Sequence, residues 1–296
     1  MELKVVQYGV AADGVATVRL HRPGRGNSWT NRMNQEYRWA MAQAERDAAV
    51  RVIVVTGTGR QFCVGADMKA LDTYTDGRTD YVESVQSDEL AKPGYGVHPE
   101  FDHDVIWQWG IRKPIICAVN GACAGMGLAL AAFSDLRYAV EGAKFTTATA
   151  RLGMPAEYGL AWLLPKMLGL TRAADLLLTG RVFLAEEAHG MGLLNGVFAQ
   201  PEFESRVAAI ASSMASTVSP LAAAATKLQL YGELMTLHGG QTIEASKALI
   251  GAMMRAPDFA EGVAAHQQQR APKFPPLDPA SLSFPPGSAS PRFTGR

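Results

Sequence analysis

Apolar positions in the first part of the chain follow two periods, one typical of strands and one typical of helices. Ala16, Val18 and Leu20 alternate with more polar neighbours, which predicts a strand with one buried face. Residues 30–49 then carry apolar side chains at helical spacing, and residues 52–56 form a continuous apolar run typical of a buried strand. The expected order is therefore strand, helix, strand.

The same rhythm returns in the middle of the chain. Strands are predicted over residues 115–120, 136–140 and 197–198, and a helix begins near Gly127. No repeat is evident in the sequence itself, but the alternation of strands and helices indicates the α/β class.

The last third of the chain is alanine-rich and has a helical pattern. Helices are predicted over residues 203–216, 221–235, 243–254 and 257–270. We expect a helical layer over residues 201–270, separate from a core formed by residues 1–200. Residues 271–296 are rich in Pro, Ser and Gly and contain few core formers, which predicts an extended or disordered tail.

A polar segment interrupts the pattern between residues 71 and 110. Its glycines, prolines and scattered carboxylates argue against a continuous buried element, so we expect a partly helical flap over a functional site. Trp107 and Trp109, near its end, are typical of ordinary helix packing. A role in the wall of a ligand site is the alternative.

Two glycine turns follow buried strands and are the most informative motifs. Residues 120–127, Asn-Gly-Ala-Cys-Ala-Gly-Met-Gly, join a strand to a helix, and free backbone N–H groups at that helix N-terminus can stabilise negative charge. Residues 62–67, Phe-Cys-Val-Gly-Ala-Asp, follow the strand at residues 52–56. Donors from two separate turns predict an oxyanion hole.

Composition limits the classes of partner. With 296 residues, a formal net charge of +0 and 48% hydrophobic residues, the chain is ample for one large core or for a core with a small helical domain. Balanced charge gives no reason to expect a nucleic acid or an anionic membrane, although a local basic patch for a phosphorylated ligand stays open. The absence of an apolar signal core, or of any apolar segment of about 18 residues, predicts a cytoplasmic protein.

Three cysteines, Cys63, Cys117 and Cys123, lie in or beside the predicted buried strands and turns. They lack the paired spacing of a zinc site or a disulfide framework. We expect all three to be small buried side chains, with a nucleophilic Cys63 as the alternative.

One local cluster contains possible metal ligands, namely His98, Asp102, His103 and Asp104. Its spacing is not diagnostic and no second half-site follows it, so we expect neither a metal nor a bound cofactor. Residues 57–62 lack the third glycine of a dinucleotide fingerprint.

An ordered set of short motifs spans most of the chain. The set comprises Arg22-Pro23 with Asn27, Gly65-Ala66-Asp67, Lys113-Pro114 leading into Asn120-Gly121, Asp135, and Leu178-Thr179-Gly180-Arg181. Together, over about residues 3–275, these motifs resemble the enoyl-CoA hydratase/isomerase (crotonase) superfamily. The resemblance implies an α/β fold, a crotonase-type spiral of repeated β-β-α units with a C-terminal helical trimerisation layer, and a homotrimer or homohexamer.

The resemblance also implies an acyl-CoA substrate, so that coenzyme A is part of the substrate and not a separate cofactor. In the family, two backbone N–H groups bind the thioester oxygen and stabilise the enolate, and here these belong to Ala66 and Met126. The adenosine and phosphates of the ligand are expected near the following residues: Arg25, the backbone of Val64, Gly65, Ala66, Asp67 and Met68, and a basic residue such as Lys69. Gly125 and Tyr158 are further candidates for substrate contact, with packing as the alternative for Tyr158. The side chains of Asp67 and Asp135 are expected to be structural.

The acid and base of the reaction are the least regular part of the pattern. Ala129 and Thr149 occupy the positions of the two hydratase glutamates, and neither side chain can act as an acid or base near neutral pH. Glu157 occupies a third position, which resembles that of the single catalytic acid in enoyl-CoA isomerases. We therefore expect double-bond isomerisation, with helix capping near Gly159 as the alternative role of Glu157. The other hypotheses are a divergent hydratase or acyl-CoA hydrolase whose acid comes from the flap, and a non-catalytic acyl-CoA binder.

Overall fold

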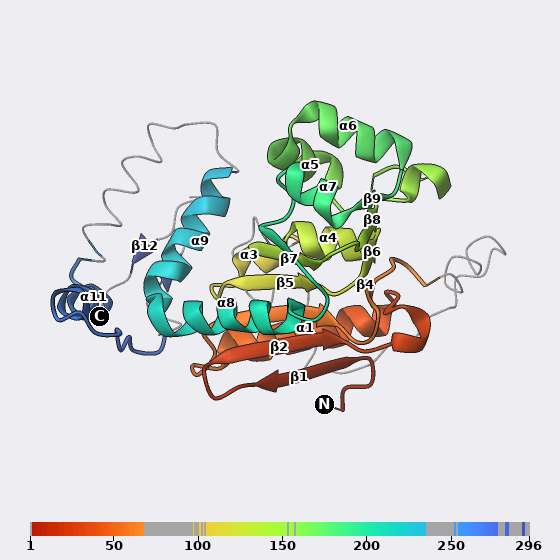
Figure 1. Ribbon diagram of the computed structural model, residues 1–296. Coiled ribbons are helices and arrows are strands. Elements are labelled where there is room, and N and C mark those ends of the chain that lie inside the picture. Colours follow the sequence, from red (N-terminus) through yellow and green to blue (C-terminus); the bar gives the residue numbers. More distant parts are fainter. Residues whose placement is uncertain are drawn as a thin grey trace.

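The computed structural model describes residues 2–67, 97, 101, 103, 105–152, 154–156, 158–234, 252, 254–277, 282–283 and 292–293 (Figure 1). Within this part of the chain, the larger sheet has six strands in the order β1-β2-β3-β5-β7-β10. These strands are β1 (Val6–Val10), β2 (Val15–Leu20), β3 (Val52–Gly57), β5 (Ile115–Val119), β7 (Leu136–Val140) and β10 (Gly196–Phe198). β1 pairs antiparallel to β2, and the other neighbours pair in parallel.

In a smaller sheet, β4-β6-β8-β9, the first three strands come from segments that directly follow strands of the first sheet, and β9 follows helix α6 (Leu170–Thr179). Its strands are β4 (Gln61–Cys63), β6 (Ala122–Ala124), β8 (Lys144–Thr146) and β9 (Phe183–Leu184). Thus β3 leads into β4, β5 into β6 and β7 into β8, and β4, β6 and β8 pair in parallel. The chain therefore winds as a spiral that adds one strand to each sheet per turn, which confirms the predicted crotonase-type architecture.

The helices lie around the two sheets (Figure 1). They are η1 (Pro23–Arg25), α1 (Asn31–Arg46), α3 (Trp107–Gly110), α4 (Met126–Ala132), η3 (Thr149–Leu152), α5 (Leu160–Leu168), α6 (Leu170–Thr179), α7 (Ala185–Gly190), α8 (Phe203–Thr217), α9 (Pro220–Leu234) and α11 (Pro257–Gln267). α1 begins where Thr30 Oγ1 accepts a hydrogen bond from Met33 N at 3.1 Å, and it ends at Arg46, before the predicted residue 49. α4 begins one residue before the predicted Gly127.

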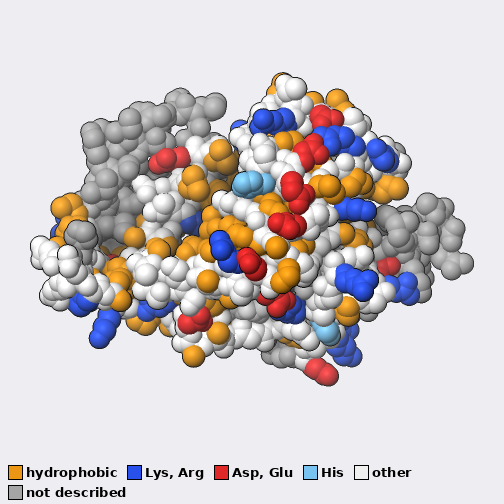
Figure 2. Space-filling view, viewed as in Figure 1, with side chains coloured by type: hydrophobic (Ala, Val, Ile, Leu, Met, Phe, Trp, Pro, Cys, Tyr) orange, Lys and Arg blue, Asp and Glu red, His pale blue; other side chains and the backbone are white. Residues whose placement is uncertain are grey.

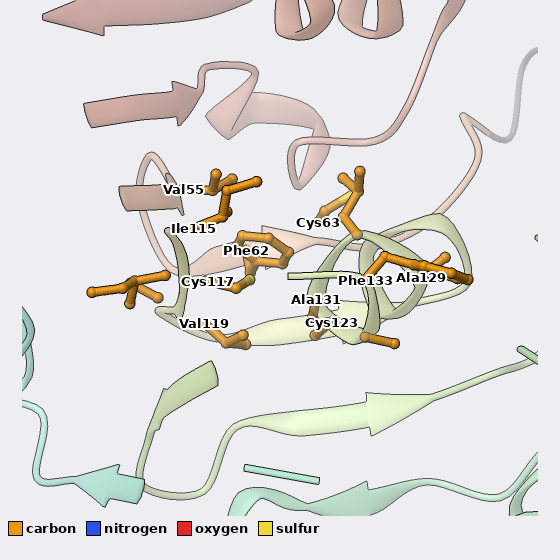
Figure 3. Close-up of a cluster of buried hydrophobic side chains, with 14 of the residues drawn as sticks. Val55, Phe62, Cys63, Ile115, Cys117, Val119, Cys123, Ala129, Ala131 and Phe133 are labelled. Atoms are coloured by element: carbon orange, nitrogen blue, oxygen red, sulfur yellow. The ribbon is translucent and has the colours of Figure 1, made fainter. Parts of the chain in front are cut away.

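The main core extends from the helices into the region where the two sheets meet, part of which is shown in Figure 3. Residues from β3, β4, β5, β6 and α4 meet there, including Val55, Phe62, Ile115, Val119 and Ala129, each at most 1% exposed. β3 is buried along its whole length, as its continuous apolar run predicts. The turns that leave β4 and β6 are therefore held by a well-packed support.

The C-terminal helices follow the strands of the larger sheet in chain order. α8 packs against β2, β3 and β7, and α9 packs against α3. A second apolar cluster joins α9 to the segment after α11 and contains Leu221, Ala224, Ala225, Ala256 and Leu277. The predicted helix over residues 243–254 lies almost entirely outside the described residues.

Part of the predicted tail is folded against the rest of the chain. Leu277 is 7% exposed, and Arg51 Nη2 donates a 2.8 Å hydrogen bond to Phe274 O. β11 (Leu282–Ser283) and β12 (Arg292–Phe293) form a short antiparallel pair. The described tail residues contain no helix, and Leu277 joins the apolar cluster on α9.

Among the described residues, no single helix is long and apolar enough to cross a membrane. α8 and α9 reach that criterion only as a pair, and they are bent by 109° relative to each other. On the face of the molecule in Figure 2, acidic and basic side chains are interspersed.

Candidate active site

The two glycine turns lie side by side because the strands that precede them are neighbours. β4 and β6 pair in parallel, with Gln61 opposite Ala122 and Cys63 opposite Cys123, so both turns leave the same edge of the smaller sheet. Gly65 has φ +94°, and a Cβ atom added there would lie 3.2 Å from Ala124 O. Glycine therefore provides both the backbone conformation and the close approach of the two turns.

The N–H group of Ala66 faces the second turn. Trp29 N donates to Gly65 O at 2.7 Å, and Asp67 N donates to Trp29 O at 3.2 Å. These two bonds use the edge of the segment that faces Trp29, so the N–H group of Ala66 points to the opposite edge, where β6 and its turn lie. Ala66 is exposed, which leaves this donor accessible.

The N–H group of Met126 is the first of helix α4. Its N-cap residue, Gly125, uses its own N–H group to bond Thr146 O at 3.1 Å and supplies no side-chain cap. The first N–H groups of a helix have no acceptor within the helix. Among the described residues, the N–H groups of Ala66 and Met126 both lack a hydrogen-bond acceptor.

Gly127 allows α4 to approach the first turn. A Cβ atom added at Gly127 would lie 2.3 Å from Cys63 O and 2.9 Å from Cys63 Cβ. The start of α4 therefore rests directly on the end of β4. The resulting arrangement is two main-chain donors on adjacent turns, which is a geometry that can stabilise an oxyanion.

A buried network fixes the far side of the first turn. Asp67 Oδ2 accepts hydrogen bonds from Arg22 Nη1 at 3.0 Å and from Ser28 Oγ at 3.1 Å. Asn27 Nδ2 donates to Thr58 O at 3.0 Å and to Gln61 O at 2.7 Å, which ties the η1 loop to β4. The carboxylate of Asp67 is 5% exposed, so the expected structural role of this side chain agrees with its contacts.

The other candidates for CoA contact lie around the same turn or outside the described residues. Arg25 is exposed at the end of η1, and Val64 N donates to Gly26 O at 3.2 Å, so the guanidinium-bearing loop borders the first turn. Met68 and Lys69 lie outside the described residues.

The positions of the two hydratase glutamates are both buried. Ala129 in α4 is 0% exposed and Thr149 in η3 is 3% exposed. Glu157 lies outside the described residues, while the next two residues, Tyr158 and Gly159, have φ values of +48° and +75°. Tyr158 is 42% exposed, so it is not packed in the core.

The three cysteines are fully buried. Burial raises the pKa of the Cys63 and Cys117 thiols to about 12 and raises the pKa of Cys123 well above its ordinary value. The thiols are therefore protonated at neutral pH, which supports small buried side chains over a nucleophilic Cys63.

Trp107 and Trp109 pack inside the protein. Trp109 is 1% exposed and stacks on Tyr231 of α9 with ring centroids 4.2 Å apart. Trp107 lies 5.8 Å from Tyr37 by the same measure. These contacts favour the packing role that the sequence suggests. The rest of the predicted flap, residues 71–104, is described only at Val97, Phe101 and His103.

Metal ligands do not gather in the described part of the chain, where no group of three or more His, Cys, Asp or Glu side chains could hold an ion. Of the candidate cluster, His103 is exposed, and His98, Asp102 and Asp104 lie outside the described residues.

Two cationic side chains with interior contacts were not expected from the sequence. Arg137 of β7 is half-buried and donates to Ser134 O, just after the end of α4, and the buried Lys227 of α9 forms a 2.7 Å ion pair with Asp135. Asp135 Oδ2 also accepts a 2.6 Å bond from Ile115 N, which agrees with its expected structural role. The feature of the sequence that could have indicated these two residues is a lone charged position within an apolar strand, for Arg137, or within an alanine-rich helix, for Lys227.

Comparisons with known proteins agree with this architecture. A family model described as enoyl-CoA hydratase/isomerase matches residues 11–92 and 98–276. The chain is 36% identical over 265 residues to a probable enoyl-CoA hydratase of Mycobacterium tuberculosis, covering 88% of this chain and 89% of that protein. It is 31% identical over 263 residues to a 1,2-epoxyphenylacetyl-CoA isomerase of Escherichia coli, covering 88% and 95%.

A solved structure shares the fold. The crystal structure of a probable enoyl-CoA hydratase/isomerase from Mycobacterium abscessus superposes with a TM-score of 0.77 at 28% identity, covering 92% of this chain and 99% of that one. With the two-sheet spiral and the paired glycine turns, these matches show that the chain belongs to the enoyl-CoA hydratase/isomerase (crotonase) family.

Proposed function

We propose that this enzyme binds an acyl-CoA thioester, stabilises its enolate on the N–H groups of Ala66 and Met126, and shifts a carbon–carbon double bond with Glu157 as its single acid/base. The observation that supports the proposal is that the N–H groups of Ala66 and Met126, for which no acceptor is found among the described residues, lie on turns that leave two paired parallel strands. Such donors stabilise the charge that develops on a thioester oxygen when a proton leaves the neighbouring carbon.

The buried Ala129 and Thr149 favour isomerisation over hydration. Hydration of an enoyl-CoA requires side chains that activate a water molecule and protonate the substrate. Neither the methyl group of Ala129 nor the hydroxyl group of Thr149 does this near neutral pH. Isomerisation needs one carboxylate, which removes a proton from C2 and returns it to C4 while the donors hold the dienolate. Glu157 is the acidic residue that the sequence offers at a family position.

The names of the relatives include both kinds of chemistry. One is a probable enoyl-CoA hydratase, and another is an isomerase of a CoA ester. Family membership therefore supports an acyl-CoA ligand. The absence of carboxylates at positions 129 and 149, together with Glu157, favours isomerisation over hydration.

The direct test is turnover of a panel of 3-enoyl-CoA esters beside hydration of crotonyl-CoA, both followed by product analysis. We expect isomerised product and negligible hydration, because each missing acid/base group is typically worth about 10²–10⁴-fold. Chelation with EDTA should leave the rate unchanged, since main-chain donors need no Lewis acid. Robust crotonyl-CoA hydration would contradict the proposal and favour the divergent hydratase.

Glu157→Gln separates catalysis from folding. It keeps the shape of the side chain but removes the base, so isomerisation should fall by about 10²-fold or more while acyl-CoA affinity is retained. Glu204→Gln, an exposed glutamate in the first turn of α8, is the matched control and should keep full activity. A Glu157→Gln enzyme with full turnover and a lowered melting temperature would instead support a capping role.

A further inference from the structure

The guanidinium group of Arg137, a half-buried residue of β7, lies at the end of helix α4. Arg137 Nη1 donates to Ser134 O at 2.5 Å, with longer contacts to Ala132 O at 3.4 Å and Ala131 O at 3.5 Å. Its Nε atom donates to Leu193 O at 2.8 Å. Ser134 lies two residues after the last residue of α4. One side chain of β7 therefore binds the turn that follows α4, reaches the carbonyl groups of the last two helical residues at longer distance, and joins them to the segment before β10.

The charge of this guanidinium is not neutralised by an ion pair in the described part of the chain. Its contacts there are carbonyl oxygens. The nearby carboxylate of Asp135 is paired with Lys227 at 2.7 Å. The positive charge of Arg137 therefore acts mainly on the negative end of the α4 dipole.

Helix α4 is short and held at both ends. It has seven residues, Met126–Ala132, so its ends are only about 10 Å apart at 1.5 Å per residue. At its start, Gly125 N bonds Thr146 O, and Gly127 lies against Cys63 O. Figure 3 shows Ala129, Ala131 and Phe133 in the same buried cluster as Cys63. A displacement at the Arg137 end therefore moves the Met126 end as well.

We propose that Arg137 is a positioning residue for the reaction, which acts through α4 on the N–H group of Met126. This inference rests on the proposed oxyanion hole. Arg137 prevents α4 from sliding along its axis, so that the N–H groups of Met126 and Ala66 can bind the same oxygen atom. Its positive charge at the opposite end of this short helix also favours an anion at the Met126 end.

A purely structural cap would act differently. Loss of a buried cap lowers the stability of the protein, but a folded molecule would keep its turnover and its polarisation of the thioester. A positioning role changes turnover and carbonyl polarisation while the affinity for a saturated acyl-CoA, which develops no charge, changes little.

The experiment compares wild type with Arg137→Met and Arg137→Lys, and uses Arg51→Met as a control. Arg51 also binds a carbonyl oxygen, Phe274 O, but in the C-terminal segment. For each protein we would measure the melting temperature, turnover at saturation, and affinity for a saturated acyl-CoA. Infrared difference spectra of a ¹³C-labelled thioester would give the shift of its carbonyl stretch on binding. All assays would run well below each melting temperature.

We expect Arg137→Met to lose about tenfold or more in turnover and part of the carbonyl shift, with affinity within about threefold. Arg137→Lys, which keeps the charge but not the fork of donors, should recover part of both, and it carries the test if Arg137→Met does not fold. Arg51→Met should match wild type in turnover and carbonyl shift. Unchanged turnover and carbonyl shift in folded Arg137 variants would overturn this inference alone, whereas no shift in wild type would overturn the oxyanion hole itself.

Discussion

Gly127→Ala is a one-atom test of the packing that places the two turns together. The added Cβ atom would lie 2.3 Å from the backbone oxygen of Cys63 and 2.9 Å from its Cβ atom. An ordinary contact needs about 3.4 Å, so the start of α4 must move by roughly 1 Å. The nearest atoms are the backbone and Cβ atoms of Cys63, so no flexible end of a side chain can absorb this shift.

The expected cost has two parts. Overpacking in a filled core typically destabilises by about 1–3 kcal/mol, and the helix propensity gained on replacing glycine by alanine offsets about 1 kcal/mol at most. With the full offset, the net loss of unfolding free energy should be about 0–2 kcal/mol. A displacement of about 1 Å at Met126 N–H can cost on the order of 10²-fold in turnover.

The assay is isomerase turnover together with urea-induced unfolding, on the same preparations. Gly190→Ala is the matched control, because Gly190 is also helical, at the end of α7, and an added Cβ atom there meets nothing within 4 Å. It should be neutral or slightly stabilising, with full activity. A Gly127→Ala enzyme as stable and active as wild type would refute the reasoning, since α4 would then not be fixed against β4.

Three further predictions concern stability and assembly. Glu36→Gln should lower the unfolding free energy by about 1–3 kcal/mol in urea titrations, because Glu36 Oε2 accepts the N–H groups of Lys4, Val5 and Val6; an unchanged midpoint would contradict this role. Stability should fall as pH rises from about 9 to 12, because burial raises the pKa of Cys63 in the folded protein to about 12, so the thiol of the unfolded chain loses its proton first. Cys63→Ala should reduce the slope of unfolding free energy against pH by up to about 1 kcal/mol per pH unit. An identical slope in the variant would contradict this prediction. We also expect a trimer or hexamer at micromolar concentration, from the alanine-rich helices after residue 201 and the family resemblance, and a monomer in sedimentation would contradict it.

The sequence predicts those elements whose period is long enough to detect. The strand at residues 136–140 agrees with β7 at both ends, and the helix predicted over residues 203–216 differs from α8 by one residue. The strands of the smaller sheet have only two or three residues each, which is too short for an alternation to be visible. The second sheet therefore follows from the family resemblance and not from periodicity.

The same limit applies to the candidate site. Glycine spacing alone indicates two turns after buried strands, but their approach depends on the pairing of Cys63 with Cys123 in a short, irregular ladder of two residue pairs. Arg137 is hidden for another reason. Its side chain acts on carbonyl groups of a different element, and backbone acceptors leave no mark in the sequence.

The spiral has a consequence for how such a protein can change over time. β3 pairs directly with β5, so the ladder Ile53–Ile115 to Thr56–Ala118 closes regardless of what the chain carries between the two strands. A change of length between residues 68 and 96 leaves the residues of that ladder and the pairing of β4 with β6 in place, whereas Phe101 lies in the core and is 0% exposed. Doubling the length of a loop adds only about 0.6 kcal/mol in closure entropy. Insertions and deletions can therefore accumulate in this interval, where new ligand contacts can arise, while the main-chain donors keep their register.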